Sequence, residues 1–119
     1  PESVTAIGSS AFSGCLSLKK IVVPDGIERI EGNMFGDCTS LTEVVLPSTL
    51  KEIRGMAFLG CIVLENIELP ESVTAIGSIA FGGCSSLKKI VVPDGIERIE
   101  GCQVRLKKSW EWRSAIARR

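Results

Sequence analysis

Five cysteines are the residues of this 119-residue chain best suited to chemistry, because a thiol can bind a metal, form a disulfide or act as a nucleophile. Four of them recur at intervals of 23 residues, at Cys15, Cys38, Cys61 and Cys84. Zinc sites usually pair ligands two to four residues apart, and no two cysteines have that spacing. The chain has no histidine, which excludes Ser–His and Cys–His nucleophilic pairs. We therefore expect these four cysteines to form a buried column of free thiols.

The fifth cysteine, Cys102, breaks this spacing, because the period would place it at position 107. We expect it to be the one reactive thiol of the chain. The motifs G-x-x-x-x-G-K-[ST], G-x-G-x-x-G and G-x-S-x-G, which bind phosphates or present a nucleophile, are all missing. The carboxylates are scattered over polar positions, without a pair suited to act as general acid and base. The sequence predicts a protein that is not an enzyme and that has no metal or cofactor.

An internal repeat sets the elements that must position these cysteines. Proline recurs at positions 1, 24, 47, 70 and 93, and phenylalanine at 12, 35, 58 and 81, again 23 residues apart. The chain therefore divides into four complete units and one partial unit, at 1–23, 24–46, 47–69, 70–92 and 93–101. We expect residues 1–101 to form one domain and residues 102–119 to form a basic tail outside the repeat.

Each unit carries the same apolar pattern, which indicates how it folds. In the first unit, Leu18-x-x-Ile21-x-Val23 ends with period two, which is typical of a short strand with one face on a core. The proline that follows cannot donate to a strand ladder. The spacing of residues 11–18 predicts a helical or 3₁₀ turn. One unit cannot bury its apolar residues alone, so we expect stacked units whose strands form a parallel sheet.

The pattern Leu-x-x-Ile-x-Val-Pro-x-x-Val-x-x-Ile-x-x-x-Ala-Phe-x-x-Cys-x-x-Leu resembles the BspA-type leucine-rich repeat over residues 1–101. The resemblance implies an α/β leucine-rich-repeat solenoid, in which short parallel strands stack in a curved right-handed coil of 23-residue repeats. It also implies a secreted or cell-surface protein, as in anaerobic bacteria and parasitic protists, often adhesive or host-binding. The asparagine that usually follows the strand is missing, so we expect no asparagine ladder.

The strand residues that point away from the core form the candidate binding face. Its polar members are Lys19, Lys20, Thr42, Glu43, Glu65, Asn66, Glu68, Lys88 and Lys89. We expect Lys20 to lie beside Glu43, and Glu65 beside Lys88. Two interpretations stay open: a surface for a protein partner, or a solvated sheet face whose charges pair with one another. The face has no aromatic or arginine anchor, which argues against a tight interface.

Charge is distributed unevenly although the 14 basic and 14 acidic residues cancel. Residues 102–119 carry a net charge of +5 and both tryptophans, Trp110 and Trp112. This tail is consistent with a helical cap on the last unit, with a frameshifted end, or with a patch that docks on an anionic membrane or nucleic acid. A net charge of zero argues against nucleic acid as the main partner, and no apolar run is long enough to span a bilayer.

The first unit begins at residue 1 without a polar cap, so it should expose Val4, Ile7, Phe12 and Leu18. We expect further repeats before Pro1, a dimer, or end-to-end filaments. The leading hypothesis is a non-enzymatic protein-binding module, a fragment of a surface or secreted adhesion protein that contacts an unknown, host-derived partner. The alternative is a structural spacer or a self-assembling unit. Residues 1–32 and 70–101 differ at three positions only, which indicates a recent duplication or an engineered array.

Overall fold

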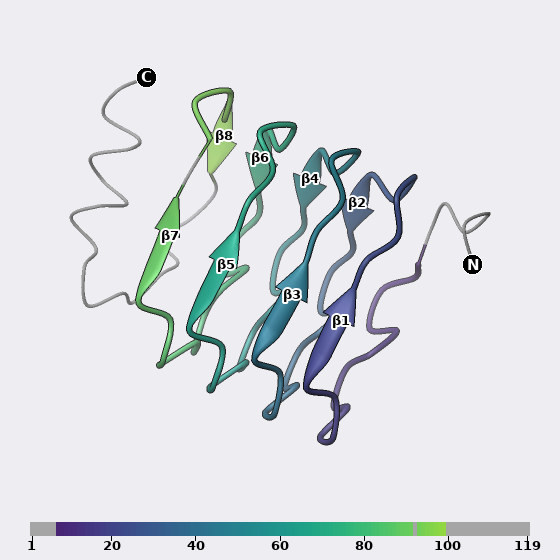
Figure 1. The fold of residues 1–119 in the computed structure, drawn as a ribbon, viewed down its shortest axis with the longest axis vertical. Coiled ribbons are helices and arrows are strands. Elements are labelled where there is room, and N and C mark those ends of the chain that lie inside the picture. Colours follow the sequence, from purple (N-terminus) through teal and green to yellow (C-terminus); the bar gives the residue numbers. More distant parts are fainter. Residues whose placement is uncertain (1–6, 92, 100–119) are drawn as a thin grey trace.

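The part of the chain that the structure describes forms eight short strands in two rows (Figure 1). The computed structural model describes residues 7–91 and 93–99, with the backbone alone at 89, 91 and 99. The first row contains the three-residue strands predicted from the sequence: β1 (Lys20–Val22), β3 (Glu43–Val45), β5 (Asn66–Glu68) and β7 (Lys89–Val91). We number the successive turns of backbone coils 1 to 4 after the sequence units 1–23, 24–46, 47–69 and 70–92.

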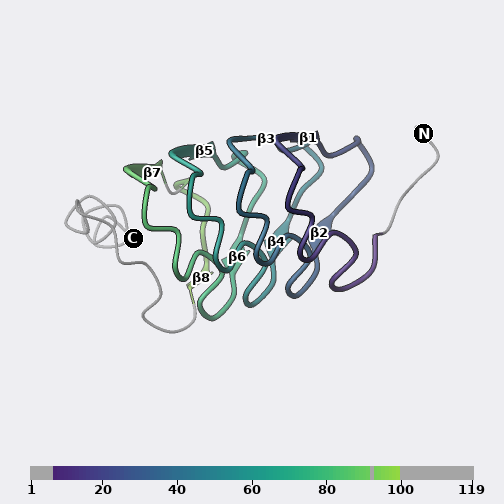
Figure 2. The ribbon, with the colours of Figure 1, turned by 90° about the horizontal axis from the view of Figure 1, so that it is seen from below.

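Every strand pair is parallel and joins residues 23 positions apart, which confirms the predicted short parallel strands. Lys20 pairs with Glu43 in β1–β3, and Asn66 pairs with Lys89 in β5–β7. The central residue of each three-residue strand is apolar and faces inward, because successive strand residues point to opposite sides. Figure 2 shows the coils side by side in sequence order, with the two rows of strands on different sides.

The second row of strands was not predicted from the sequence. It consists of β2 (Arg29–Ile30), β4 (Glu52–Ile53), β6 (Ala75–Ile76) and β8 (Arg98–Ile99), which form one continuous sheet in that order. Each strand has only two residues, so it is too short to show an alternating pattern. The isoleucines of β2, β4 and β6 are buried, which explains why every unit keeps an isoleucine there.

The helical or 3₁₀ turn predicted for residues 11–18 is wrong, since this segment forms consecutive turns and the described residues contain no helix. Ser10 and Gly14 have positive φ angles of 61° and 75°, a conformation that interrupts a right-handed helix. Every second backbone N–H group of this segment therefore donates to the next coil and not within its own coil. The Phe12 N–H, for example, donates to the Met34 carbonyl of coil 2 at 2.9 Å. A helix directs its amides along its own axis and could not make this bond to a neighbouring coil.

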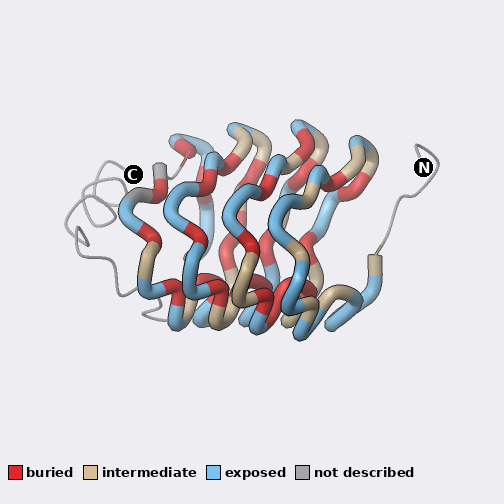
Figure 3. The backbone as a smooth tube through the Cα atoms, turned by 60° about the horizontal axis from the view of Figure 1, so that its bottom comes forward, coloured by how far each residue is buried: buried red, intermediate tan, exposed pale blue. Residues whose placement is uncertain are grey.

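The core is a continuous cluster of apolar side chains contributed by successive coils. Figure 3 shows the buried positions recurring from coil to coil along the backbone. The rings of Phe12, Phe35, Phe58 and Phe81 stack in order, with centroids 5.5, 5.2 and 5.4 Å apart and planes within 12° of parallel. These separations lie within the range in which aromatic rings attract one another, so the stacked rings contribute to the core beyond their burial. The three inner rings are 0–1% exposed.

Coil 1 is less completely covered than the inner coils. Five apolar side chains are only half-buried there, whereas their counterparts in coils 2 and 3 are buried: Ile7, Phe12, Cys15, Leu18 and Ile21. An apolar groove of about 380 Å³, which includes Ile7, Phe12 and Ile21 in its lining, opens at this end. Ile7, Phe12 and Leu18 were predicted to be exposed, and they are half-exposed. Val4, which was predicted to be exposed with them, lies outside the described residues.

Candidate functional site

The candidate site is the outer surface of the first row of strands, here called the strand face. Its predicted members with described side chains are all exposed: Lys19, Lys20, Thr42, Glu43, Glu65, Asn66, Glu68 and Lys88. Lys89 belongs to β7 and pairs through its backbone with Asn66. The parallel pairing at an offset of 23 residues brings these side chains together on one surface. Val22 and Val45 also lie there, directly opposite each other and 57% and 43% exposed.

Two ion pairs cross neighbouring coils on the strand face, as predicted. Lys20 Nζ lies 3.7 Å from Glu43 Oε2, and Lys88 Nζ lies 3.9 Å from Glu65 Oε1. All four side chains are more than half exposed, so each pair contributes only about 0–1 kcal/mol to stability. The two ion pairs therefore add too little to the free energy of unfolding to account for the charged residues of the strand face.

Charges on the strand face are ordered along the row. Coils 1 and 4 present lysines, Lys20 and Lys88 among them, whereas coils 2 and 3 present Glu43, Glu65 and Glu68. Each ion pair joins an outer coil to an inner one, so both point away from the boundary between coils 2 and 3. Among the described residues, no ion pair reaches Glu68. The centre of the face is therefore acidic and its two sides are basic.

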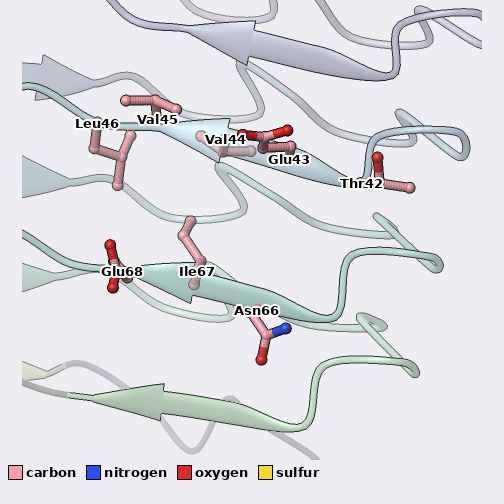
Figure 4. Close-up of a pocket in the computed structure, with 8 residues that line it drawn as sticks. All are labelled: Thr42, Glu43, Val44, Val45, Leu46, Asn66, Ile67 and Glu68. Atoms are coloured by element: carbon pink, nitrogen blue, oxygen red, sulfur yellow. The ribbon is translucent and has the colours of Figure 1, made fainter.

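The strand ladder is interrupted at this acidic boundary. The first row consists of two separate pairs, β1–β3 and β5–β7, and β3 forms no ladder with β5. The interruption leaves the facing edges of β3 and β5 without backbone partners, and a groove of about 470 Å³ lies there (Figure 4). We call it the β3–β5 groove, and its lining residues are Thr42, Glu43, Val44, Val45, Leu46, Asn66, Ile67 and Glu68. Sequence reasoning missed it, because units 2 and 3 have the same apolar pattern as the paired units.

The four repeated cysteines form the predicted interior column rather than a reactive site. Three donate their thiol hydrogen to a phenylalanine carbonyl of the preceding coil: Cys38 to Phe12 at 3.1 Å, Cys61 to Phe35 at 3.2 Å and Cys84 to Phe58 at 3.1 Å. All four are free thiols, and Cys15 at the open end is half-buried. No group of three or more metal-ligating residues occurs in the described part of the chain. Cys102 lies outside it.

Burial changes the acidity of these thiols. It raises the pKa of Cys38 above the ordinary value, because a thiolate loses its hydration in the apolar column. The neighbouring thiol of Cys84, together with burial, raises the pKa of Cys61, and the same neighbour relation lowers the pKa of Cys84. The raised pKa values keep the thiols of Cys38 and Cys61 protonated at neutral pH, which makes these two poor nucleophiles and poor metal ligands.

A network of charges on the second row of strands was also missed. Arg29 Nε lies 3.4 Å from Glu31, Arg54 Nε lies 3.8 Å from Glu31 and 3.4 Å from Glu52, and Arg98 reaches across β6 to Glu52 at 3.8 Å. The signal was present in the sequence, since Arg29 and Glu52, and likewise Glu31 and Arg54, alternate in sign at an offset of 23 residues. Each of these three arginines pairs with a glutamate, whereas among the described residues no ion pair reaches Glu68 on the strand face.

Comparison with known proteins identifies the repeat. A family model for the BspA type leucine rich repeat region, in six copies, matches residues 1–104. No curated protein matches the chain. Within the described residues, no helix is present that could cross a bilayer.

Three solved structures are similar. A T. pallidum leucine rich repeat protein has 34% identity and a TM-score of 0.80, over 85% of this chain and 49% of that chain. A leucine rich cell surface protein from Faecalibacterium prausnitzii has 39% identity and a TM-score of 0.72, over 76% and 24%. The pneumococcal vaccine antigen PcpA has 28% identity and a TM-score of 0.78, over 90% and 28%. The chain thus spans less than half the length of each of these proteins.

Proposed function

Because the chain belongs to the BspA-type leucine-rich repeat family, we propose that it is a non-enzymatic module that binds another protein through the strand face. One observation supports this most: the strand face holds exposed charges and two exposed valines that the fold itself does not need. Its ion pairs are weak, and among the described residues no ion pair reaches Glu68 at its centre. Repeat arrays offer such extended surfaces to partners.

The module would belong to a longer secreted or cell-surface protein that contacts a host or matrix protein. The similar structures include a bacterial cell surface protein and a vaccine antigen, which favours this setting. We further propose that residues 1–101 coil as a curved, right-handed solenoid and that residues 102–119 form a separate tail. Both predictions extend to residues outside the described part.

A panel of immobilised extracellular matrix proteins tests this function. The strand-face variant replaces Lys19, Lys20, Glu65 and Glu68 with serine, and its matched control replaces four charged residues elsewhere: Arg29, Lys51, Glu28 and Glu71. Each set removes two positive and two negative charges from exposed positions. We expect the strand-face variant to lose binding at least tenfold and the control to stay within twofold. Equal losses in both, or no loss in either, would contradict the proposal.

The apolar groove of coil 1 favours a second candidate function, a self-assembling or spacer unit. Its half-buried Ile7, Phe12 and Ile21 would be covered by the end of a second copy. Sedimentation velocity over a wide concentration range tests this, with Ile7→Lys as the variant that should abolish association. A monomer at high concentration would contradict it. Docking of the tail on anionic surfaces stays a prediction, which removal of residues 102–119 and a salt titration would test.

A further inference from the structure

The opening between coils 2 and 3 is confined to the strand face. On the opposite row, β2 and β4 pair normally. In the turns, the Phe35 N–H donates to the Ala57 carbonyl at 2.8 Å, and the core rings of Phe35 and Phe58 stack at 5.2 Å. The same two coils are thus fully joined in the core and in the turns. The β3–β5 groove is therefore a local feature of this surface and not a general separation of the coils.

The groove presents negative charge and unpaired backbone groups together. Glu43 and Glu68 line it, and Glu65 precedes β5 on the same face. The lysines that pair with Glu43 and Glu65 lie on coils 1 and 4, outside the groove. Figure 4 shows Glu43 on one strand and Glu68 on the other. At the offset of 23 residues Glu43 is level with Asn66 and Glu68 with Val45, so the two carboxylates are diagonal neighbours and no lysine lies between them.

We propose that the β3–β5 groove binds an extended, arginine-bearing segment of another protein. This inference rests on the proposed function, and it specifies the chemistry of the partner. A guanidinium group has five N–H donors in a planar fork, which suit the carboxylates of Glu43 and Glu68 and the carbonyls of an unpaired strand edge. Lysine offers a compact point charge without this fork, so the site should prefer arginine.

A second copy of the same face is a poorer occupant. If two faces met about a twofold axis with their rows antiparallel, coil 2 of one copy would lie over coil 3 of the other. Glu43 would then face Glu65 and Glu68, and the lysines of coil 1 would face those of coil 4. Such contacts between like charges are repulsive. The charge order therefore favours a different protein that is basic at its centre.

The exposed valines define what should lie next to the arginine. Val45 lines the groove, and Val22 lies directly opposite it in β1, so together they form a small apolar surface beside the carboxylates. An aliphatic residue of the partner would cover this surface while the neighbouring arginine enters the groove. The binding segment should therefore carry an arginine followed closely by an aliphatic residue.

Short synthetic peptides test the inference on the full chain. The probe is a fluorescein-labelled octapeptide with arginine and valine at alternate odd positions and threonine between them, which places arginine and valine on one side when extended. Matched peptides carry lysine or glutamate in place of arginine. Fluorescence anisotropy gives the affinities, and ¹⁵N chemical shifts of the labelled chain locate the site. We expect the arginine peptide to bind more tightly than the lysine peptide, with the largest shifts at residues 42–46 and 66–68.

Two sets of neutralising variants separate specific binding from general attraction. Glu68→Gln should weaken the arginine peptide about two- to fivefold, the range of one exposed charge pair. The groove set, E43Q, E65Q and E68Q combined, should weaken it about tenfold or more by the same estimate. The control set, E28Q, E71Q and E97Q combined, changes the net charge equally at exposed positions elsewhere and should leave the affinity within twofold. Circular dichroism confirms that each variant is folded.

Three results would overturn the inference. Equal losses in the groove and control sets would mean non-specific attraction. A glutamate peptide that binds best, with shifts at Lys19, Lys20 and Lys88, would move the site to the basic coils and leave the proposed strand-face function intact. No shift on the strand face with any peptide would also exclude the groove, and the matrix-protein panel would then decide the proposed function independently.

Discussion

Phe58 provides the strongest test of how the coils hold one another. Its ring is 0% exposed and stacks on Phe35 at 5.2 Å and on Phe81 at 5.4 Å. Phe58→Ala removes the buried ring and both stacking contacts, so it should lower the free energy of unfolding by about 3–5 kcal/mol. Such a loss is comparable with the whole stability of many small domains, so the variant can be unfolded at room temperature.

Two further variants make the measurement quantitative. Phe58→Leu keeps apolar bulk and loses two ring contacts, each worth about 0.5–1.5 kcal/mol, which predicts a loss of about 1–3 kcal/mol. Phe12→Ala removes a half-buried ring with one described ring neighbour, Phe35, so it should cost about half as much as Phe58→Ala. Urea unfolding followed by circular dichroism gives the three values. Equal costs for Phe12→Ala and Phe58→Ala, or a cost near zero for Phe58→Ala, would refute the reasoning.

Three more predictions follow from the packing. Gly8 and Gly77 occupy equivalent positions 69 residues apart. A Cβ added to Gly77 would lie 2.8 Å from the carbonyl carbon of Arg54, whereas a Cβ added to Gly8 would have no heavy atom within 4 Å. Gly77→Ala should therefore lower the free energy of unfolding, measured in urea, by about 1–3 kcal/mol, and Gly8→Ala should lower it by almost nothing. Equal effects would argue against the close approach of coils 3 and 4. Arg54 contacts both Glu31 and Glu52. Arg54→Ala should therefore lower the free energy of unfolding by about 0.5–1 kcal/mol at low salt and by less in 1 M NaCl, because salt screens exposed ion pairs. A loss that does not change with salt would contradict this. The raised pKa of Cys61 keeps its thiol neutral in the folded chain, whereas the thiol of the unfolded chain ionises above about pH 8.5. The contribution of Cys61 to the free energy of unfolding is therefore fully present below that pH and falls as the pH rises above it. In Cys61→Ala this decline should be shallower by about 1.4 kcal/mol per pH unit, measured under reducing conditions, and an unchanged slope would show that Cys61 ionises normally in the folded chain.

The sequence predicted those parts of the fold that depend on one repeated pattern. The apolar spacing around Leu18 and Ile21 was sufficient for the strands of the first row, and the period of 23 residues placed Lys20 beside Glu43. Both inferences need only the alternation of side chains along a strand and the stacking of equivalent positions.

Features that depend on backbone geometry could not be predicted. Met56 and Ile79 adopt positive φ angles of 62° and 46°, although neither residue type favours that conformation as glycine or asparagine does. These angles convert the expected helical turn into a ladder of turns. The β3–β5 groove was likewise missed, since units 2 and 3 share the apolar pattern of the paired units and only the backbone shows that their strands form no ladder.

Aromatic NMR tests the central claim most directly, because the chain has only four phenylalanines and each belongs to a different coil. We predict ring-to-ring nuclear Overhauser effects between Phe12 and Phe35, between Phe35 and Phe58, and between Phe58 and Phe81, with none between rings two coils apart. Contacts that skip a coil, or no contacts among the four rings, would contradict stacking at an offset of 23 residues and every inference about the strand face.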